Sequence, residues 1–193
     1  YTGMEGGSAL AGVLYRDVNP SGKLPFAMPQ DSKDYPYFTP YTDNITYGYY
    51  HGYTLFDKKD TEVAYPFGFG MSYTIYSYDN LQVLTPQLSS NDTLRVQVDV
   101  TNSGEMAGEE VVQMYVGFAN SGVDRPVKLL YDFDKIALQP GETRTVTLEV
   151  PVKELAWYNP DDSEWQTETM SYQVYVGGSS AEEDLLTGIF SVQ

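Results

Sequence analysis

Apolar and polar residues alternate one by one along several short stretches in the second half of the chain. The clearest stretch covers residues 94–100, where leucine and valine alternate with Arg95, Gln97 and Asp99. Alternation with a period of two is typical of a strand that buries one face. The same pattern predicts further strands at four places: 112–116, 146–150, 172–176 and 189–192.

Turn residues separate these strands. Asn102-Ser103-Gly104 follows the first, Pro140-Gly141 precedes the third and Gly177-Gly178 follows the fourth. Short alternating strands with regular turns are typical of a sandwich of two antiparallel sheets. The pattern over residues 79–193 therefore predicts a two-sheet sandwich of the immunoglobulin or fibronectin type III kind, and the fold class is mainly β.

Residues 1–30 follow a different pattern, a short helix and then an extended run. Ser8 can cap a helix in which Leu10, Val13 and Leu14 share one face. The turn residues at 19–22 end this helix, and residues 23–28 form at most an edge strand because prolines flank them. Thirty residues with one helix cannot enclose a core, so we interpret this segment as the remnant of an α/β domain.

Residues 31–78 are rich in proline, glycine and tyrosine and show no sustained period of 2 or 3.6. A long loop of this kind is unusual inside a compact domain. Its aromatic content differs from that of flexible linkers, which are rich in glycine and serine. We expect an ordered arm that lies across a surface, with the rings of Phe67 and Phe69 buried at a glycine turn.

Charge and composition exclude several functions. The chain has 11 Lys and Arg against 27 Asp and Glu, a net charge of −16. This charge argues against binding to nucleic acid or to an anionic membrane, since both need a basic surface. There is no cysteine and only one histidine, His51, so disulfides, thiolate nucleophiles and multi-histidine metal sites are excluded. We expect no cofactor and no metal site.

Carboxylates are abundant but grouped in dense runs, at Glu109-Glu110, Asp161-Asp162 and Glu182-Glu183-Asp184. A general acid needs an apolar pocket that raises its pKa, which runs of exposed like charge do not provide. We therefore expect solvated surface at each run. His51 stands among tyrosines and is expected to be structural, and the glycine-rich loop around Glu5 lacks the lysine of a phosphate-binding loop.

Two tripeptides, at Asn44 and Asn91, fit the N-glycosylation pattern, but about one such match is expected by chance. They do not decide whether either asparagine is modified.

Three consecutive motifs resemble glycoside hydrolase family 3. Residues 3–29, GMEGGSALAGVLYRDVNPSGKLPFAMP, resemble the end of the family's second, α/β-sandwich domain. TYGYYHGYTLFD and AYPFGFGMSYT resemble its linker. Two residues differ from the family's usual pattern: Phe69 stands where histidine is frequent, and His51 lies near a position where arginine is frequent. VDVTNSGEMAGEEVVQMYV, RPVKLLYDFDKIALQPGETRTV and YQVYVGGSS resemble its fibronectin type III-like domain. The resemblance divides the chain into 1–30, the end of the α/β domain; 31–78, the linker; and 79–193, the fibronectin type III-like domain.

This resemblance implies a retaining, exo-acting β-glycosidase of the β-glucosidase type, which removes terminal non-reducing β-D-glucosyl residues. In the family the nucleophile is an aspartate on a barrel domain, and the acid/base glutamate belongs to an earlier part of the second domain. Neither motif occurs in these 193 residues, so no catalytic residue is assigned and the substrate-binding residues are unknown. The expected partners are the remaining catalytic domains, which this part would brace.

Other readings stay open at this stage. A β-xylosidase of the same family is one alternative, and a non-catalytic carbohydrate-binding or interaction module, using exposed Trp157 and Trp165, is another. The resemblance favours secretion or a periplasmic location over the cytoplasm. The sequence leaves open whether the protein forms a homo-oligomer.

Overall fold

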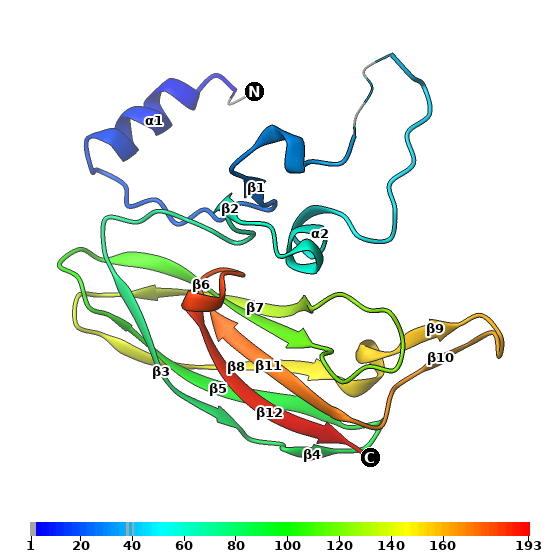
Figure 1. The fold of residues 1–193 in the computed structure, drawn as a ribbon. Helices are drawn as coiled ribbons and strands as arrows, with labels where there is room; N and C mark the ends of the chain where they lie inside the picture. The colour runs from blue at the N-terminus through cyan, green and yellow to red at the C-terminus, as the bar shows by residue number, and fades with distance from the viewer. Residues whose placement is uncertain (1–2, 38, 40) are drawn as a thin grey trace.

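The computed structural model describes residues 3–37, 39 and 41–193. Figure 1 shows a β-sandwich in the lower part of the view and, above it, two short helices and long connecting segments from the first third of the chain. The mainly β fold with a two-sheet sandwich, which the alternating pattern predicts, is confirmed. Within the described residues, no helix is long and apolar enough to cross a membrane.

One sheet of the sandwich has five strands, in the order β4-β12-β11-β6-β7. The strands are β4 (Gln87–Leu88), β6 (Gly108–Gly117), β7 (Lys128–Leu138), β11 (Ser171–Gly177) and β12 (Leu185–Val192). The other sheet has three strands in the order β3-β5-β8, which are β3 (Tyr76–Val83), β5 (Thr93–Asn102) and β8 (Thr143–Pro151). All pairings in these sheets are antiparallel except that of β12 with β4.

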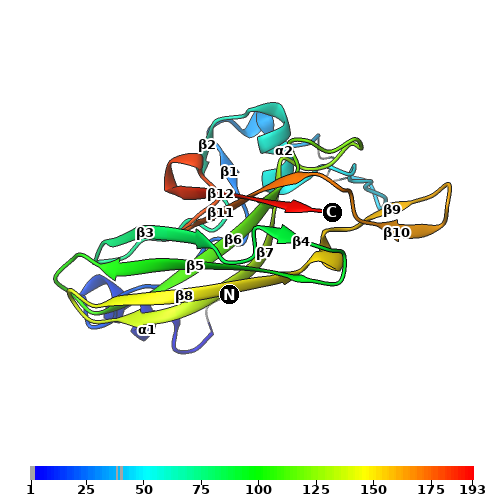
Figure 2. The ribbon, with the colours of Figure 1, turned by 90° about the horizontal axis from the view of Figure 1, so that it is seen from below.

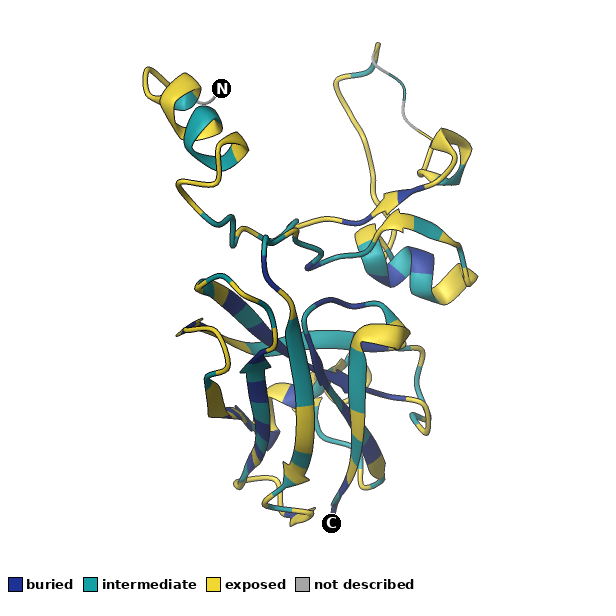
Figure 3. Cartoon of the chain, turned by 90° about the vertical axis from the view of Figure 1, so that its left-hand side faces the viewer, coloured by how far each residue is buried: buried dark blue, intermediate teal, exposed yellow. Residues whose placement is uncertain are grey.

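The core lies between the two sheets, as the alternation requires. Leu94, Val96, Val98 and Val100 of β5 are fully buried, while the residues between them are not. Each such side chain contributes about 1.5–3 kcal/mol when it leaves water. The inward residues of β6, β8 and β11 complete the same cluster together with Phe190 of β12. Figure 3 shows this concentration of buried residues in the sandwich.

The helix predicted near the N-terminus is present but begins earlier than expected. Helix α1 (Gly6–Leu14) has Glu5 at its N-cap and no side-chain capping bond, so the expectation that Ser8 caps it is wrong. No residue of α1 is buried. A nine-residue helix is marginal in water without tertiary packing, and α1 is tied to the rest of the chain by the Tyr73 hydroxyl, which donates to the carbonyl of Val13 at 2.8 Å.

The extended run after α1 pairs only locally. Leu24 exchanges two backbone hydrogen bonds with Gly68 and Phe69, both 2.8 Å long. Further on, β1 (Met28–Pro29) pairs with β2 (Val63–Tyr65) in an antiparallel two-stranded sheet. The expected edge strand over residues 23–28 is therefore reduced to short contacts, because Pro25 and Pro29 have no N–H to donate.

The segment 31–78 is not a uniform arm. It contains a 3₁₀ turn, η1 (Ser32–Asp34), and a two-turn helix, α2 (Gly52–Lys59), which the sequence pattern does not predict. Phe56 of α2 is 3% exposed, and the Thr54 hydroxyl donates to the carbonyl of His51 at 2.8 Å. Between η1 and α2, the described residues form an extended excursion that projects away from the sandwich (Figure 1). The excursion does not lie on the sandwich, so the expectation that this part of the arm crosses a surface stays a prediction.

A small hairpin stands apart from both sheets. Strands β9 (Trp157–Asn159) and β10 (Glu164–Gln166) pair only with each other. The 3₁₀ turns η2 (Val152–Leu155) and η3 (Glu182–Asp184) precede the hairpin and β12. Figures 1 and 2 both show the hairpin projecting from one end of the sandwich.

Candidate functional site

Carboxylates in the described part of the chain do not converge on a reaction centre. No group of three or more metal-ligating residues gathers among the described residues. The Asp161-Asp162 and Glu182-Glu183-Asp184 runs lie on the exposed surface, at the hairpin tip and at η3. The features that carry functional information are instead an unusual exposed surface and the contacts that fix it to the sandwich.

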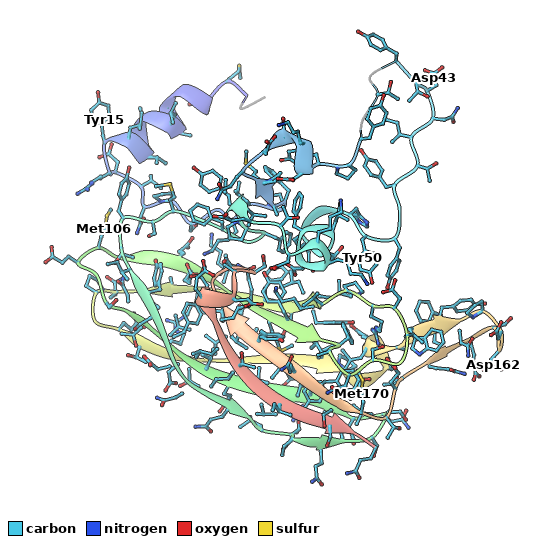
Figure 4. All side chains as sticks on the ribbon, viewed as in Figure 1. Tyr15, Asp43, Tyr50, Met106, Asp162 and Met170 are labelled. Carbon is cyan, nitrogen blue, oxygen red and sulfur yellow. The ribbon has the colours of Figure 1, made fainter. Side chains whose placement is uncertain are left out.

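The first 78 residues expose most of their large apolar side chains. Among the described residues, sixteen of the twenty-two exposed large hydrophobics lie before residue 79. Only Ala27 and Phe56 of the twenty-four buried hydrophobic residues lie there. Figure 4 places Tyr15 at the outer end of α1 and Asp43 on the excursion, both pointing away from the sandwich. We call this set the exposed N-terminal apolar residues: Met4, Leu10, Leu14, Tyr15, Val18, Phe26, Met28, Tyr35, Tyr37, Tyr41, Ile45, Tyr47, Tyr49, Tyr65, Met71 and Ile75.

Apolar exposure on this scale marks an interaction surface. Monomeric soluble proteins rarely expose large contiguous apolar patches, and singly scattered apolar residues need no explanation. Here the exposed side chains belong to segments that have almost no core of their own. Their exposure therefore favours a role of these segments as an interaction surface.

A partly buried ion pair fixes the segment after α1 to the sandwich. The Lys23 ammonium lies 2.9 Å from the Glu110 carboxylate of β6, and the Tyr78 hydroxyl of β3 donates to the same oxygen at 2.8 Å. We call these three residues the linker clamp. The prediction that Glu110 is solvated is wrong, because the residue is 6% exposed and only its neighbour Glu109 points outward. Burial, together with the Glu110 charge, raises the pKa of Tyr78 well above its usual range.

A second ion pair fixes α2. Lys128, at the start of β7, lies 2.9 Å from the Asp57 carboxylate, and the Lys128 side chain is 5% exposed. Burial raises the pKa of Asp57, and the Lys128 ammonium opposes that rise. One turn earlier, the Tyr53 hydroxyl accepts a hydrogen bond from the backbone N–H of Leu130 at 3.1 Å. Helix α2 is thus held on the edge of the five-stranded sheet by polar contacts from two residues.

Gln113 of β6 connects three parts of the chain. Its amide donates to the carbonyls of Gly68 and Gly178, and the Tyr115 hydroxyl donates to its oxygen at 2.6 Å. Gly68 has φ +77, and a Cβ at that position would collide with the Gln113 amide. Glycine is therefore required where the linker passes over the sheet. The neighbouring rings of Phe67 and Phe69 are half-buried, less than the sequence suggests.

At the outer surface, Asp124 connects the loop after β6 to the linker. It accepts hydrogen bonds from Lys58 at 2.6 Å and from Tyr50 at 2.7 Å. The hydrogen bond from Lys58 is the main cause that lowers the pKa of Asp124.

His51 has a local role in this region. It occupies the N-cap of α2, is exposed, and its Nδ1 lies 3.3 Å from the carbonyl of Tyr49. It also lines an apolar pocket of about 410 Å³ with Phe26, Tyr53, Phe67 and Leu129. The Tyr53 and Phe67 rings stack there at 4.7 Å.

Two family models match the chain in the order that its motifs suggest. The glycosyl hydrolase family 3 C-terminal domain matches residues 1–73, and the fibronectin type III-like domain matches residues 110–180. The chain belongs to glycoside hydrolase family 3. The membership that the three motifs predict is thereby confirmed.

Similar proteins carry β-glucosidase names. This family 3 chain is 38% identical to probable beta-glucosidase I of Aspergillus fumigatus over 203 residues, which covers 100% of the chain and 24% of that protein. It is 39% identical to thermostable beta-glucosidase B of Acetivibrio thermocellus, covering 91% and 24%. The chain spans about a quarter of the length of the curated relatives that it matches.

Solved structures show the same arrangement. The beta-D-glucoside glucohydrolase of Trichoderma reesei superimposes with a TM-score of 0.88 at 31% identity, covering 99% of this chain and 29% of that one. Beta-glucosidase 3B of Thermotoga neapolitana, solved with alpha-D-glucose, gives 0.85 at 40% identity, covering 97% and 26%. The segments before the sandwich are included in both superpositions, because nearly the whole family 3 chain is covered.

Sequence reasoning missed the contacts that hold residues 1–78 of the family 3 chain to its sandwich. Lys23 and Glu110 lie 87 positions apart, and Asp57 and Lys128 lie 71 apart. No local pattern connects residues at such separations. The one available signal is the isolated Lys23 in an otherwise apolar and proline-rich run, since a buried lysine needs a carboxylate partner.

The remaining sequence candidates of the family 3 chain fall on its surface. Asn44 and Asn91 are both exposed, on the excursion and in the turn before β5. Trp157 is half-buried and Trp165 exposed, and the two are not cross-strand partners in the hairpin. The binding-module alternative expects both tryptophans to be exposed, and only Trp165 is.

Proposed function

We propose that this chain is the C-terminal part of a retaining, exo-acting β-glycosidase of the β-glucosidase type, which hydrolyses terminal non-reducing β-D-glucosyl residues. The similarity to proteins named as β-glucosidases supports this activity. In the proposed division, residues 1–30 complete an α/β domain, residues 31–78 are the linker and residues 79–193 are the fibronectin type III-like domain.

The exposed N-terminal apolar residues are the observation that carries the proposal. All of them except Ile75 lie within the residues that the family 3 C-terminal domain model matches, and these segments have almost no core of their own. Helix α1, without one buried residue, is the extreme case. The rest of the enzyme supplies the surface that buries these side chains.

The chain contributes by bracing rather than by chemistry. Retention requires two carboxyl groups about 5–5.5 Å apart, one as nucleophile and one as acid/base. Misplacement of reacting groups by about 1 Å can cost about a hundredfold in rate. The linker clamp fixes the 1–30 segment to a rigid sandwich, and the Asp57–Lys128 pair and Gln113 fix the linker to it. Both catalytic carboxyl groups are proposed to lie outside these residues.

The first test compares the chain alone with a chimera. The 193-residue chain is expected to hydrolyse no aryl β-glucoside. Two variants of the Acetivibrio thermocellus relative are then made. In the deletion the matched quarter is removed, and in the chimera it is replaced by this chain. The deletion is expected to be inactive and the chimera active, because the graft restores the surface that the catalytic domains need.

Two outcomes contradict the proposal: turnover by the verified chain alone, or a soluble chimera with native mass and no activity. A chimera carrying Leu10→Asp and Leu14→Asp is the matched control, since it places charge on the exposed face of α1 and leaves the sandwich intact. The β-xylosidase alternative is decided in the longer protein that carries this chain, by comparing aryl β-glucoside with aryl β-xyloside.

A further inference from the structure

The β9–β10 hairpin displays two aromatic rings that no core explains. Tyr158 is 48% exposed and Trp165 is 71% exposed. The hairpin belongs to neither sheet of the sandwich, and Figure 4 shows its tip, with Asp162, beyond the body of the domain. The exposure of the Tyr158 and Trp165 rings is therefore not a by-product of packing between the two sheets.

The two rings form a fixed pair. Tyr158 and Trp165 are direct cross-strand partners, so their side chains stand on the same face of the hairpin. Their centroids lie 5.6 Å apart with an interplanar angle of 65°, an edge-to-face contact. Trp157, one residue earlier, points to the opposite face and is half-buried.

Hydrogen bonds on the hairpin hold this pair in place before any ligand binds. The Asn159 amide donates to Asp162 at 2.8 Å and to Gln166 at 3.1 Å. The Gln166 amide donates to Asp162 and to Glu164, both at 2.9 Å. A ring pair on such a tied hairpin loses little conformational freedom on binding, which favours affinity.

We propose that the Tyr158–Trp165 pair is a binding platform for a neutral carbohydrate chain, with β-glucans as the ligand class. The choice of β-glucan rests on the proposed function. An aromatic ring offers an apolar face to the C–H groups of a sugar, and the phenol and indole N–H offer polar contacts to its hydroxyls. The carboxylates near the hairpin tip add acceptors for hydroxyl donors.

Charge excludes the competing ligands. The last forty residues, 154–193, contain eight Asp and Glu and neither Lys nor Arg. A polyanion such as nucleic acid or an acidic polysaccharide would be repelled. A second copy of this chain, with its own net charge of −16 and its own acidic hairpin, would be repelled as well. A neutral polyol meets no such penalty.

Affinity electrophoresis of the 193-residue chain tests the proposal. A soluble neutral β-glucan in the native gel is expected to retard the chain, and its carboxymethylated anionic form is expected to retard it much less. Trp165→Ala and Tyr158→Ala are each expected to weaken binding at least tenfold, whereas Trp165→Phe retains a ring and most of the retardation. Phe133→Ala is the matched control, because Phe133 is an aromatic of similar exposure on β7.

A second measurement covers the case in which an alanine variant fails to fold. In the unmodified chain, saturating glucan is expected to shield Trp165 from a neutral collisional quencher of fluorescence. The proposal is overturned by absence of retardation and shielding, by retardation that persists in folded Trp165→Ala, or by self-association that this variant abolishes. Hydrolysis enters neither measurement, so the failure of this proposal and that of the proposed function are separate results.

Discussion

At the scale of single residues, the buried linker clamp has the largest predicted effect. Lys23→Met leaves the Glu110 carboxylate buried with only the Tyr78 hydroxyl as partner. An uncompensated buried charge lowers the free energy of unfolding by about 3 kcal/mol. Chemical denaturation of the variant measures this loss.

The control is Arg95→Met, which breaks the exposed pair of Arg95 with Glu149 at 3.0 Å. Exposed pairs contribute at most about 1 kcal/mol. Adding Glu110→Gln to Lys23→Met is expected to recover most of the loss, since it removes the stranded charge. Equal losses in the free energy of unfolding for Lys23→Met and Arg95→Met would refute the role given to the linker clamp.

Buried tyrosines predict how stability depends on alkaline pH. Burial raises the pKa of Tyr131 and of Tyr172 from 10.0 to about 12 each. Because the folded-state pKa lies above the unfolded one, their contribution to stability is complete below pH 10 and is lost as the pH rises through 12. We expect the thermal midpoint to fall over that range.

The absorbance of tyrosinate measures the same groups directly. Because burial raises the pKa of Tyr131 and of Tyr172 to about 12, these two phenols are expected to ionise only near pH 12 or on unfolding. In Tyr131→Phe and Tyr172→Phe the alkaline dependence is expected to weaken. A single ionisation of all tyrosines near pH 10 in the folded protein would contradict the prediction.

At the scale of elements, Gly68 decides whether the linker can pass over the five-stranded sheet. Gly68→Ala forces a Cβ into the Gln113 amide at a positive φ, so we expect stability to fall by about 2 kcal/mol. Gly141→Ala is the control, because Gly141 has a similar φ of +75 and open space around its Cβ position. If chemical denaturation gave equal losses of stability for Gly68→Ala and Gly141→Ala, backbone strain alone would explain the effect and the collision with Gln113 would be refuted.

The same scale shows what sequence reasoning can reach. Strands β5, β8 and β11 are predicted because each buries every second residue against one core, and β6 because Val112, Met114 and Val116 alternate in the sequence although its second half is buried on both faces. Strand β7 is missed because a register shift opposite Met114 and Tyr115 interrupts its alternation. Helix α2 is missed because two turns are too few to establish a period, and its two buried residues are Thr54 and Phe56. The family resemblance supplies what periodicity could not, the order of the parts.

At the scale of the whole molecule, protection from proteolysis is expected to depend on the surface that the catalytic domains are proposed to supply. A protease that cleaves after aromatic residues is expected to cut the chain first at Tyr37 and Tyr41, which are 90% and 96% exposed. The sandwich is expected to persist as a resistant product, because it has a core of its own. Mass spectrometry of a digestion series identifies the cuts.

The active chimera is the comparison for this digestion. There the catalytic domains are expected to cover the exposed N-terminal apolar residues and to slow these cuts at least tenfold. Cleavage inside β5 or β6 before the excursion would contradict the hierarchy of stability that burial implies.

The long separations between the partners of the two ion pairs also set an order for folding during synthesis. Residues 1–78 leave the ribosome before β5, β6 and β7 are synthesised. Lys23 and Asp57 therefore have no ion-pair partner until Glu110 and Lys128 have emerged. Contacts between residues so far apart form late, because the chain between them must first be ordered. During that interval many of the tyrosines are open to association with other nascent chains. We therefore expect the yield of this protein in cells to depend strongly on chaperone supply and on growth temperature.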